Sequence, residues 1–228
     1  MRGAIGPDGV TETTRLFTWM SYYPLMQVSN ERGRDRSFTT TARRAQIVTA
    51  TIDTIAELGY GQASFARIAE RAGLSSTRLI SYHFASKQEL MEQVIDEVYG
   101  MIGRFMAARM AHQSTASGAL RAYIEATVAF LAEHRTEMKA LLGIFLNGAL
   151  SYDPAVHELV VLDPIERLLR DGQRSGEFRQ FDPRVMAASI RRSLDGLPML
   201  LESHPGLDLA ACAGELVVMF DLATRNTP

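Results

Sequence analysis

The chain has 228 residues, which is enough for one large domain or for a small domain followed by a larger one. Its hydrophobic fraction of 46% allows a sizeable core, while a formal net charge of −2 gives no overall attraction to nucleic acid. The single cysteine, Cys212, excludes an intramolecular disulfide and a thiolate metal cluster, and we interpret it as a small buried residue.

Residues 1–38 show no sustained periodicity, and we predict a mobile N-terminal extension in which Met20 and Met26 are alternative starts. The apolar stretch 16–28 is too short and too polar to be a membrane anchor or a leader, so we expect a cytoplasmic protein without membrane contact. Five arginines lie at the end of this extension or just after it: Arg32, Arg34, Arg36, Arg43 and Arg44. They form either a flexible arm that reaches a minor groove or a solubilising tail.

A helical period follows the extension, and no strand pattern competes with it. It predicts a first helix over 41–58. Ser64 can cap a second helix, because its hydroxyl can accept a hydrogen bond from a backbone N–H of the first turn. Gly73 then supplies a sharp turn before a short third helix. This succession over 39–85 is typical of a helix-turn-helix DNA-binding domain.

The short third helix, capped by Ser75 or Ser76, is predicted to have two faces. The apolar arc consists of Leu79, Ile80, His83 and Phe84, and the polar arc of Thr77, Arg78, Ser81 and Tyr82. We expect the apolar arc to pack against the first two helices. In a major groove, arginine can make two hydrogen bonds to a guanine, and serine or threonine hydroxyls can serve several bases. The alternative for the polar arc is an ordinary solvated helix face.

Residues 86–228 are predicted to form a larger helical body, so the whole chain is expected to be all-α. Ser86 and Glu89 make a capping box at the start of a long helix that extends to about residue 112. Further helices are expected over 116–134, 136–150, 154–175, 183–203 and 208–224.

The DNA-binding unit carries three motifs in order: IAERAGLS at 68–75, YHF at 82–84 and SKQEL at 86–90. Together they strongly resemble the TetR family of transcriptional regulators, at motif level over about 41–90 and in architecture beyond. The resemblance implies a regulator that binds a palindromic double-stranded DNA operator as a homodimer, most often a repressor released by a small molecule. The alternatives are an activator, or a helical ligand-binding or scaffold protein that does not bind an operator.

The resemblance also implies roles for individual residues. It implies base-proximal positions at Ser75, Ser76, Thr77 and Arg78, and backbone-contacting positions at Ser64, Tyr82, His83 and Lys87. His83 either donates to a phosphate or packs at the core edge, whereas a cation at the first turn of a helix, as at Lys87, favours a phosphate partner. The sequence departs from the family pattern by one extra residue near Ser75 and Ser76, and by Ala63 where threonine is common.

Two further sites are predicted in the helical body. Apolar stripes on the last two helices either pack on the body or, as the resemblance implies, form a dimer interface: Ile190, Leu194, Leu197, Leu201, Leu216 and Phe220. Methionine and aromatic side chains of 86–150 form either plain core or a largely apolar effector cavity with a few polar anchors. The candidates for this cavity are Phe105, Phe130, His134, Met138, Leu141, Phe145 and Asn147, with His157 and Glu166 as further anchors.

Motifs of enzyme chemistry are missing from the sequence. The histidines at 83, 112, 134, 157 and 204 show no metal-binding spacing. The chain also has no phosphate-binding glycine loop and no nucleophile elbow. We therefore expect neither catalysis nor a metal or other cofactor.

Overall fold

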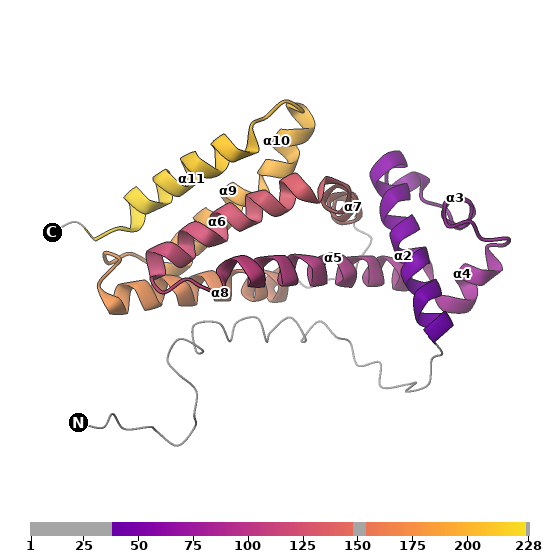
Figure 1. Ribbon diagram of the computed structural model, residues 1–228, viewed down its shortest axis with the longest axis horizontal. Coiled ribbons are helices and arrows are strands. Elements are labelled where there is room, and N and C mark those ends of the chain that lie inside the picture. Colours follow the sequence, from indigo (N-terminus) through magenta and orange to yellow (C-terminus); the bar gives the residue numbers. More distant parts are fainter. Residues whose placement is uncertain (1–37, 148–153, 227–228) are drawn as a thin grey trace, which may run out of the picture.

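The computed structural model describes residues 38–147 and 154–226 of the protein. Regular structure within these ranges is helical, apart from an isolated antiparallel bridge between Phe178 and Arg225. The prediction of an all-α fold, with a helix-turn-helix unit and a larger helical body, is confirmed. Figure 1 shows the small unit at one end of an elongated molecule. The predicted extension lies outside the described residues, except that Phe38 already begins the first described helix.

The DNA-binding unit consists of α2 (Phe38–Leu58), η2 (Tyr60–Gln62), α3 (Phe65–Arg71) and α4 (Arg78–His83). Gly59 follows α2 with a φ of 83°, and Gly73 follows α3 with a φ of 62°. Both lie in the left-handed region that favours glycine, so glycine permits both turns. The centre of the unit is formed by side chains that are at most 1% exposed: Ile47, Ile55, Ile68, Ile80 and Phe84.

Helix α5 (Lys87–Met110) leads from this unit into the body (Figure 1). Its predicted cap at Ser86 is present, since the Ser86 hydroxyl accepts from Glu89 N at 3.0 Å. The Glu89 carboxylate reaches back to Ala85 N at 2.6 Å, one residue further than a capping box normally reaches. Leu90 of α5 and Ile144 of α7 (Arg135–Leu146) belong to the same hydrophobic core as the DNA-binding unit. This core crosses the expected boundary between residues 85 and 86, which stays a prediction.

The body contains α6 (Ala116–Glu133), α7 (Arg135–Leu146), α8 (Pro154–Ser175), α9 (Pro183–Asp195), α10 (Leu197–Ser203) and α11 (Leu209–Thr224). The prediction of one helix over 183–203 is wrong, because the chain is divided at Gly196 into α9 and α10. Pro198 explains the division, since it has no N–H for the carbonyl of Leu194 and its ring crowds that carbonyl.

Helix pairs of the body enclose a second core. Helix α6 packs against α11, and α8 packs against α9. The end of α11 is joined to the loop after α8, since Arg179 N donates to Thr224 O at 2.9 Å. Among the described helices, none is both long enough and apolar enough to cross a membrane.

Candidate nucleic-acid interface

Helix α4 presents a polar face outward and a narrow apolar edge inward. Ile80 is fully buried and Phe84 is 1% exposed, so these two residues, four apart, fix the helix to the core. Thr77, Arg78, Ser81 and Tyr82 are all exposed, Tyr82 by 80%. The structure therefore gives the predicted polar arc free access to a partner. Leu79 corrects the predicted apolar arc, because it lies beside the buried edge and is 36% exposed.

Two serine hydroxyls hold the helix starts of this unit. Ser64 Oγ accepts from Arg67 N at 3.4 Å at the start of α3, as the sequence predicted. Ser76 Oγ accepts from Arg78 N at 3.1 Å, so Ser76 and not Ser75 supports the start of α4. Each hydroxyl acts as an acceptor in these bonds, so its own hydrogen can still be donated to a further acceptor.

Lys87 occupies the first position of α5. Its ammonium lies 4.5 Å from the centre of the Tyr60 ring in η2. This cation–π contact provides an intramolecular partner that the sequence did not reveal, because 27 positions separate the two residues. A role of Lys87 toward phosphate stays a prediction.

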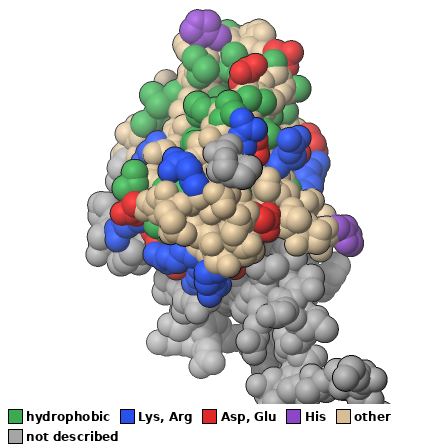
Figure 2. All heavy atoms as spheres, turned by 90° about the vertical axis from the view of Figure 1, so that its left-hand side faces the viewer, with side chains coloured by type: hydrophobic (Ala, Val, Ile, Leu, Met, Phe, Trp, Pro, Cys, Tyr) green, Lys and Arg blue, Asp and Glu red, His purple; other side chains and the backbone are tan. Residues whose placement is uncertain are grey.

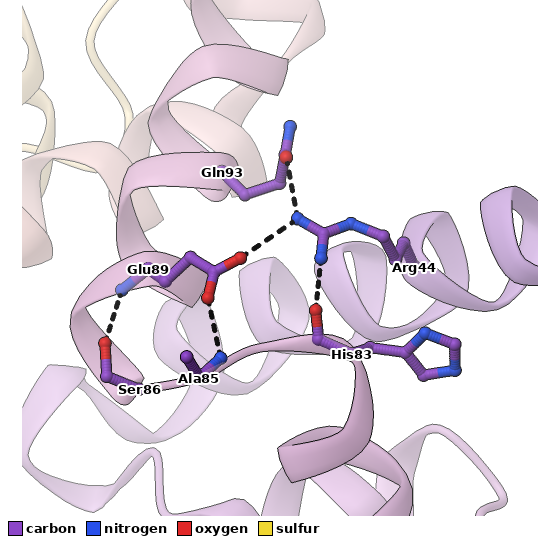
Figure 3. Close-up of polar contacts among 6 residues, drawn as sticks. All are labelled: Arg44, His83, Ala85, Ser86, Glu89 and Gln93. Atoms are coloured by element: carbon purple, nitrogen blue, oxygen red, sulfur yellow. Dashed lines mark hydrogen bonds and ion pairs between the residues drawn. The ribbon is translucent and has the colours of Figure 1, made fainter. Parts of the chain in front are cut away.

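Arg44 was predicted to belong to an arginine arm or tail, and this prediction is wrong. Its side chain is 15% exposed and points into the junction between α2, α4 and α5. Figure 3 shows the guanidinium between the carbonyl of His83 and the side chains of Glu89 and Gln93. Arg43 also lies within α2 and not in a flexible arm; it is half-buried and donates to Gln46 at 2.7 Å. The predicted arm residues Arg32, Arg34 and Arg36 lie outside the described residues.

His83 lies at the edge of the DNA-binding unit, where its ring could either donate to a phosphate or pack at the core edge. The residue is half-buried, and its ring meets the Tyr82 ring edge to face, with centroids 5.0 Å apart. The His83 carbonyl, in contrast, faces inward and accepts from Arg44 (Figure 3). The backbone of His83 is thus tied to α2, while its ring points away from that contact.

The predicted effector residues fall into separate groups. Phe105, Phe130 and His134 pack on one another, with His134 stacked on Phe130 at 4.4 Å and Arg109 lying 3.4 Å above the Phe105 ring. Leu141 belongs to the core shared with the DNA-binding unit. These residues therefore belong to different packing groups, and their part in an effector cavity stays a prediction.

The remaining candidates have other surroundings. Met138 lines a hollow of about 240 Å³ between α7 and α10, together with Leu131, Leu142, Pro198 and Leu201. Phe145 is half-buried beside the shared core. Asn147 is exposed and donates to Gly143 O at 2.8 Å. Glu166 pairs with Arg170 at 2.7 Å, and the side chain of His157 lies outside the described part.

The predicted dimer residues face inward. Ile190, Leu194, Leu197 and Phe220 are at most 7% exposed, and Leu201 and Leu216 are half-buried against the same core. The four buried residues hold α9, α10 and α11 onto the body and offer no surface to a second copy, whereas a dimer role of Leu201 and Leu216 stays a prediction. Exposed apolar side chains occupy the opposite faces of these helices: Val185, Met199, Leu200, Val218, Met219 and Leu222. Figure 2 shows hydrophobic side chains gathered in the upper part of the face that it presents.

Comparison with known proteins identifies the family. A family model for the bacterial regulatory proteins of the tetR family matches residues 47–94, from α2 into α5. The HTH-type transcriptional regulator BetI of Cronobacter sakazakii is 30% identical over 188 residues, which are 81% of this chain and 86% of that protein. The chain belongs to the TetR family. It is therefore a transcriptional regulator with a helix-turn-helix DNA-binding domain, and no catalytic activity is indicated.

Two other similarities extend over the helical body of this TetR-family regulator. A transcriptional regulator from Saccharomonospora viridis was solved in complex with choline, and its structure matches this one with a TM-score of 0.70 at 20% sequence identity. The match covers 82% of this chain and 100% of that chain. The A-factor receptor protein of Streptomyces griseus is 28% identical over 166 residues, 70% of this chain and 55% of that protein. The first of these supports the fold across both parts of the molecule.

One polar group inside the body of this TetR-family member was missed by the sequence reasoning. Arg191 Nε lies 2.8 Å from Asp195 on α9, and its side chain hydrogen-bonds Tyr123 of α6. Burial opposes the charge of Arg191, but Tyr123, Asp195 and Tyr99 outweigh it and raise the pKa above its ordinary value. The spacing of Arg191 and Asp195, one helical turn apart, was the available signal. Elsewhere in the described ranges, no three His, Cys, Asp or Glu side chains are grouped so as to hold a metal ion.

Proposed function

We propose that this regulator is a ligand-responsive repressor that binds a palindromic operator as a dimer and leaves it when a small molecule binds the body. The observation that carries the proposal is the exposed polar face of α4, held outward by the buried pair Ile80 and Phe84. A short helix anchored by one edge and free on the other can enter a major groove.

The proposed operator contacts follow the faces of the DNA-binding unit. Thr77, Arg78 and Ser81 are directed to base edges, with Arg78 as the bidentate donor to guanine. Phosphates are proposed for residues around this face: Ser64, Tyr82, His83 and Lys87. Their hydroxyl, ring and ammonium groups can donate hydrogen bonds to phosphate oxygens. Such contacts position the protein on the duplex but do not distinguish one base sequence from another. Ser75 and Ser76, just before α4, are proposed to lie close to the bases.

A dimer is proposed because α4 is too short to read a whole operator. A helix of six residues contacts few bases, and two-fold pairing onto a palindrome doubles the site. We propose that the exposed faces of α9, α10 and α11 form the interface, in place of the inward-facing residues first predicted. Met199 of α10 and Met219 and Leu222 of α11 are 59%, 47% and 55% exposed, which leaves apolar area for a partner copy.

A largely apolar effector is proposed for the body. The S. viridis regulator binds choline, a quaternary ammonium compound, and such cations are recognised through open aromatic faces. In this chain Arg109 covers one face of Phe105, and His134 stacks on Phe130. This arrangement argues against a cation cage built from these rings. The many apolar side chains of α5, α6 and α7 favour a ligand with an apolar body and few polar groups.

Selection of binding sites from a random duplex library by the full chain tests the proposal. A repressor of this kind should enrich one palindromic motif, and a gel shift on that motif should show one dimer bound per site. Transcription from a promoter that carries the motif should fall when the protein is added. A rise in transcription would instead indicate an activator, and no enriched sequence would indicate a helical ligand-binding protein without an operator.

A further inference from the structure

Arg44, on α2, contacts two other elements at once, α4 and α5. Its Nη1 donates to the carbonyl of His83 at the end of α4. Its Nη2 donates to Gln93 Oε1 at 3.2 Å and lies 3.5 Å from Glu89 Oε1, both on α5. The guanidinium also lies 4.1 Å from the centre of the Phe84 ring. Figure 3 shows this arginine reaching from α2 across the junction.

Each of these contacts uses a property of the guanidinium group. The last carbonyls of a helix have no intrahelical donor, so an arginine at the His83 carbonyl satisfies an acceptor that would otherwise need water. The planar fork presents donors in two directions, toward α4 and toward α5, and its flat face stacks on Phe84. A lysine ammonium, which is a compact point charge, cannot reproduce this set of contacts.

The partners of Arg44 are themselves held in place. The second oxygen of Glu89 accepts from Ala85 N at 2.6 Å, and Glu89 N donates to Ser86 Oγ at 3.0 Å. The link between α4 and α5 is therefore fixed to α5 through Glu89, and Arg44 joins both the end of α4 and Glu89 to α2 (Figure 3). Arg44 itself is 15% exposed, so it is shielded from a duplex that lies against the outer face of α4.

We propose that Arg44 is a positioning residue for operator recognition, which fixes the C-terminal end of α4 against α2 and α5 without touching DNA. The proposal rests on the proposed operator binding. Helix α4 has only six residues, of which Ile80 is buried, and Phe84 is buried at its C-cap. Its angle to the body depends on how its last residue is held. A guanidinium that joins His83 to the first two turns of α5 sets that angle, and with it the register of Arg78 on the bases.

The experiment compares Arg44→Met, Arg44→Lys and the matched control Arg43→Met in the full chain. Arg43→Met removes the same charge one residue away, at a half-buried side chain whose described hydrogen bond goes to Gln46 and not to α4 or α5. The operator is the motif enriched by the wild-type chain from a random duplex library. Affinity is measured for this operator and for a scrambled duplex over a range of salt concentrations, at a temperature where circular dichroism shows each variant folded.

Arg44→Met should lower the ratio of operator to scrambled affinity by about tenfold or more, while Arg43→Met leaves this ratio unchanged. The salt dependence of Arg44→Met should match that of Arg43→Met or exceed it, because Arg44 releases no counterion from DNA. Arg44→Lys should not restore the ratio although it keeps the charge. Stability alone cannot produce this pattern, since both affinities are measured on folded protein.

Three outcomes would overturn the role of Arg44. The first is an equal ratio for Arg44→Met and Arg43→Met, and the second is full rescue by Arg44→Lys. The third is an equal loss on both duplexes with a smaller salt dependence, which would mean a direct phosphate contact. If Arg44→Met does not fold, Gln93→Met removes one of the two α5 contacts of Arg44 and leaves Glu89 in place, and it should lower the ratio to an intermediate value. An unchanged ratio for that variant also overturns the role, whereas failure of the wild type to enrich any motif overturns the proposed function itself.

Discussion

The ammonium of Lys87 lies 4.5 Å from the centre of the Tyr60 ring, so the first residue of α5 rests on the 3₁₀ turn that precedes α3. A cation at a helix N-terminus meets the positive end of the helix dipole. The aromatic face offsets this cost, since an exposed cation–π contact contributes about 0.5–1 kcal/mol. Because an ammonium has three donors, the ring contact leaves others for a phosphate.

Lys87→Ala should weaken binding to operator and to scrambled duplex by similar factors. The slope of log affinity against log salt should fall by about one per half-site, because one phosphate contact is lost. Fluorescence anisotropy at several salt concentrations measures both effects. Lys139→Ala, at the other lysine of the sequence and on α7, is the matched control and should change neither. A lower melting temperature with an unchanged salt dependence of binding would show that Lys87 stabilises the fold through Tyr60 and does not contact a phosphate.

Arg78→Ala should act on sequence discrimination. If Arg78 binds a guanine with two hydrogen bonds, its loss should cost about 1–3 kcal/mol per half-site and relax the preference at one position of each half-site. Binding-site selection with the variant shows which position is relaxed. Arg104→Ala, on the body helix α5 and paired with Glu97 at 3.6 Å, removes an equal charge away from α4 and should leave the selected motif unchanged. An unaltered motif for Arg78→Ala would remove this residue from base readout.

The DNA-binding unit could be predicted because its signals are local. Gly73 marks the turn by its positive φ, and Ser64 and Ser86 mark helix starts by their hydroxyls. Ile80 and Phe84, four residues apart, mark the buried edge of α4. These features involve residues within one or two helical turns of each other, so they can be recognised from neighbouring residues in the sequence. The family resemblance rests on the same segment.

Contacts between distant residues could not be predicted in this way. Arg44 and His83 lie 39 positions apart, and nothing in the sequence near Arg44 distinguishes it from its neighbour Arg43, which bonds only locally to Gln46 in the described hydrogen bonds. The burial of four of the predicted dimer residues could not be foreseen for a related reason. Periodicity identifies an apolar stripe such as Ile190 and Leu194, but it does not say whether the stripe covers its own body or a second copy. The stripe proved to be internal.

A charge on the outer face of α11 should disrupt the proposed dimer. Met219→Arg and Leu222→Arg place guanidinium groups on an apolar surface that two copies would bury, and an unpaired buried charge is strongly unfavourable. Sedimentation equilibrium should show a shift from dimer to monomer, with operator affinity reduced because half-sites are then bound singly. Leu146→Arg, at another exposed apolar residue on α7, is the control and should leave the dimer intact. A stable dimer in the α11 variants would place the interface elsewhere.

Arg191 should stabilise the body more than its neighbour Arg192 does. Both face Asp195, at 2.8 Å and 3.1 Å, but the Arg191 side chain is 27% exposed and that of Arg192 is 59% exposed. Arg191→Leu also deprives Tyr123 of a hydrogen-bond partner. The free energy of unfolding should therefore fall by about 1–3 kcal/mol, as expected when a largely buried polar partner is lost.

The matched variant Arg192→Leu should change the free energy of unfolding by no more than about 0.5 kcal/mol, which is typical of an exposed substitution. Urea unfolding followed by circular dichroism compares the two at one protein concentration, because a dimer makes apparent stability depend on concentration. Tyr123→Phe should reproduce part of the loss seen for Arg191→Leu and add little to it in the double variant, since both remove the same hydrogen bond. Fully additive losses would mean that Arg191 and Tyr123 stabilise the body through separate contacts.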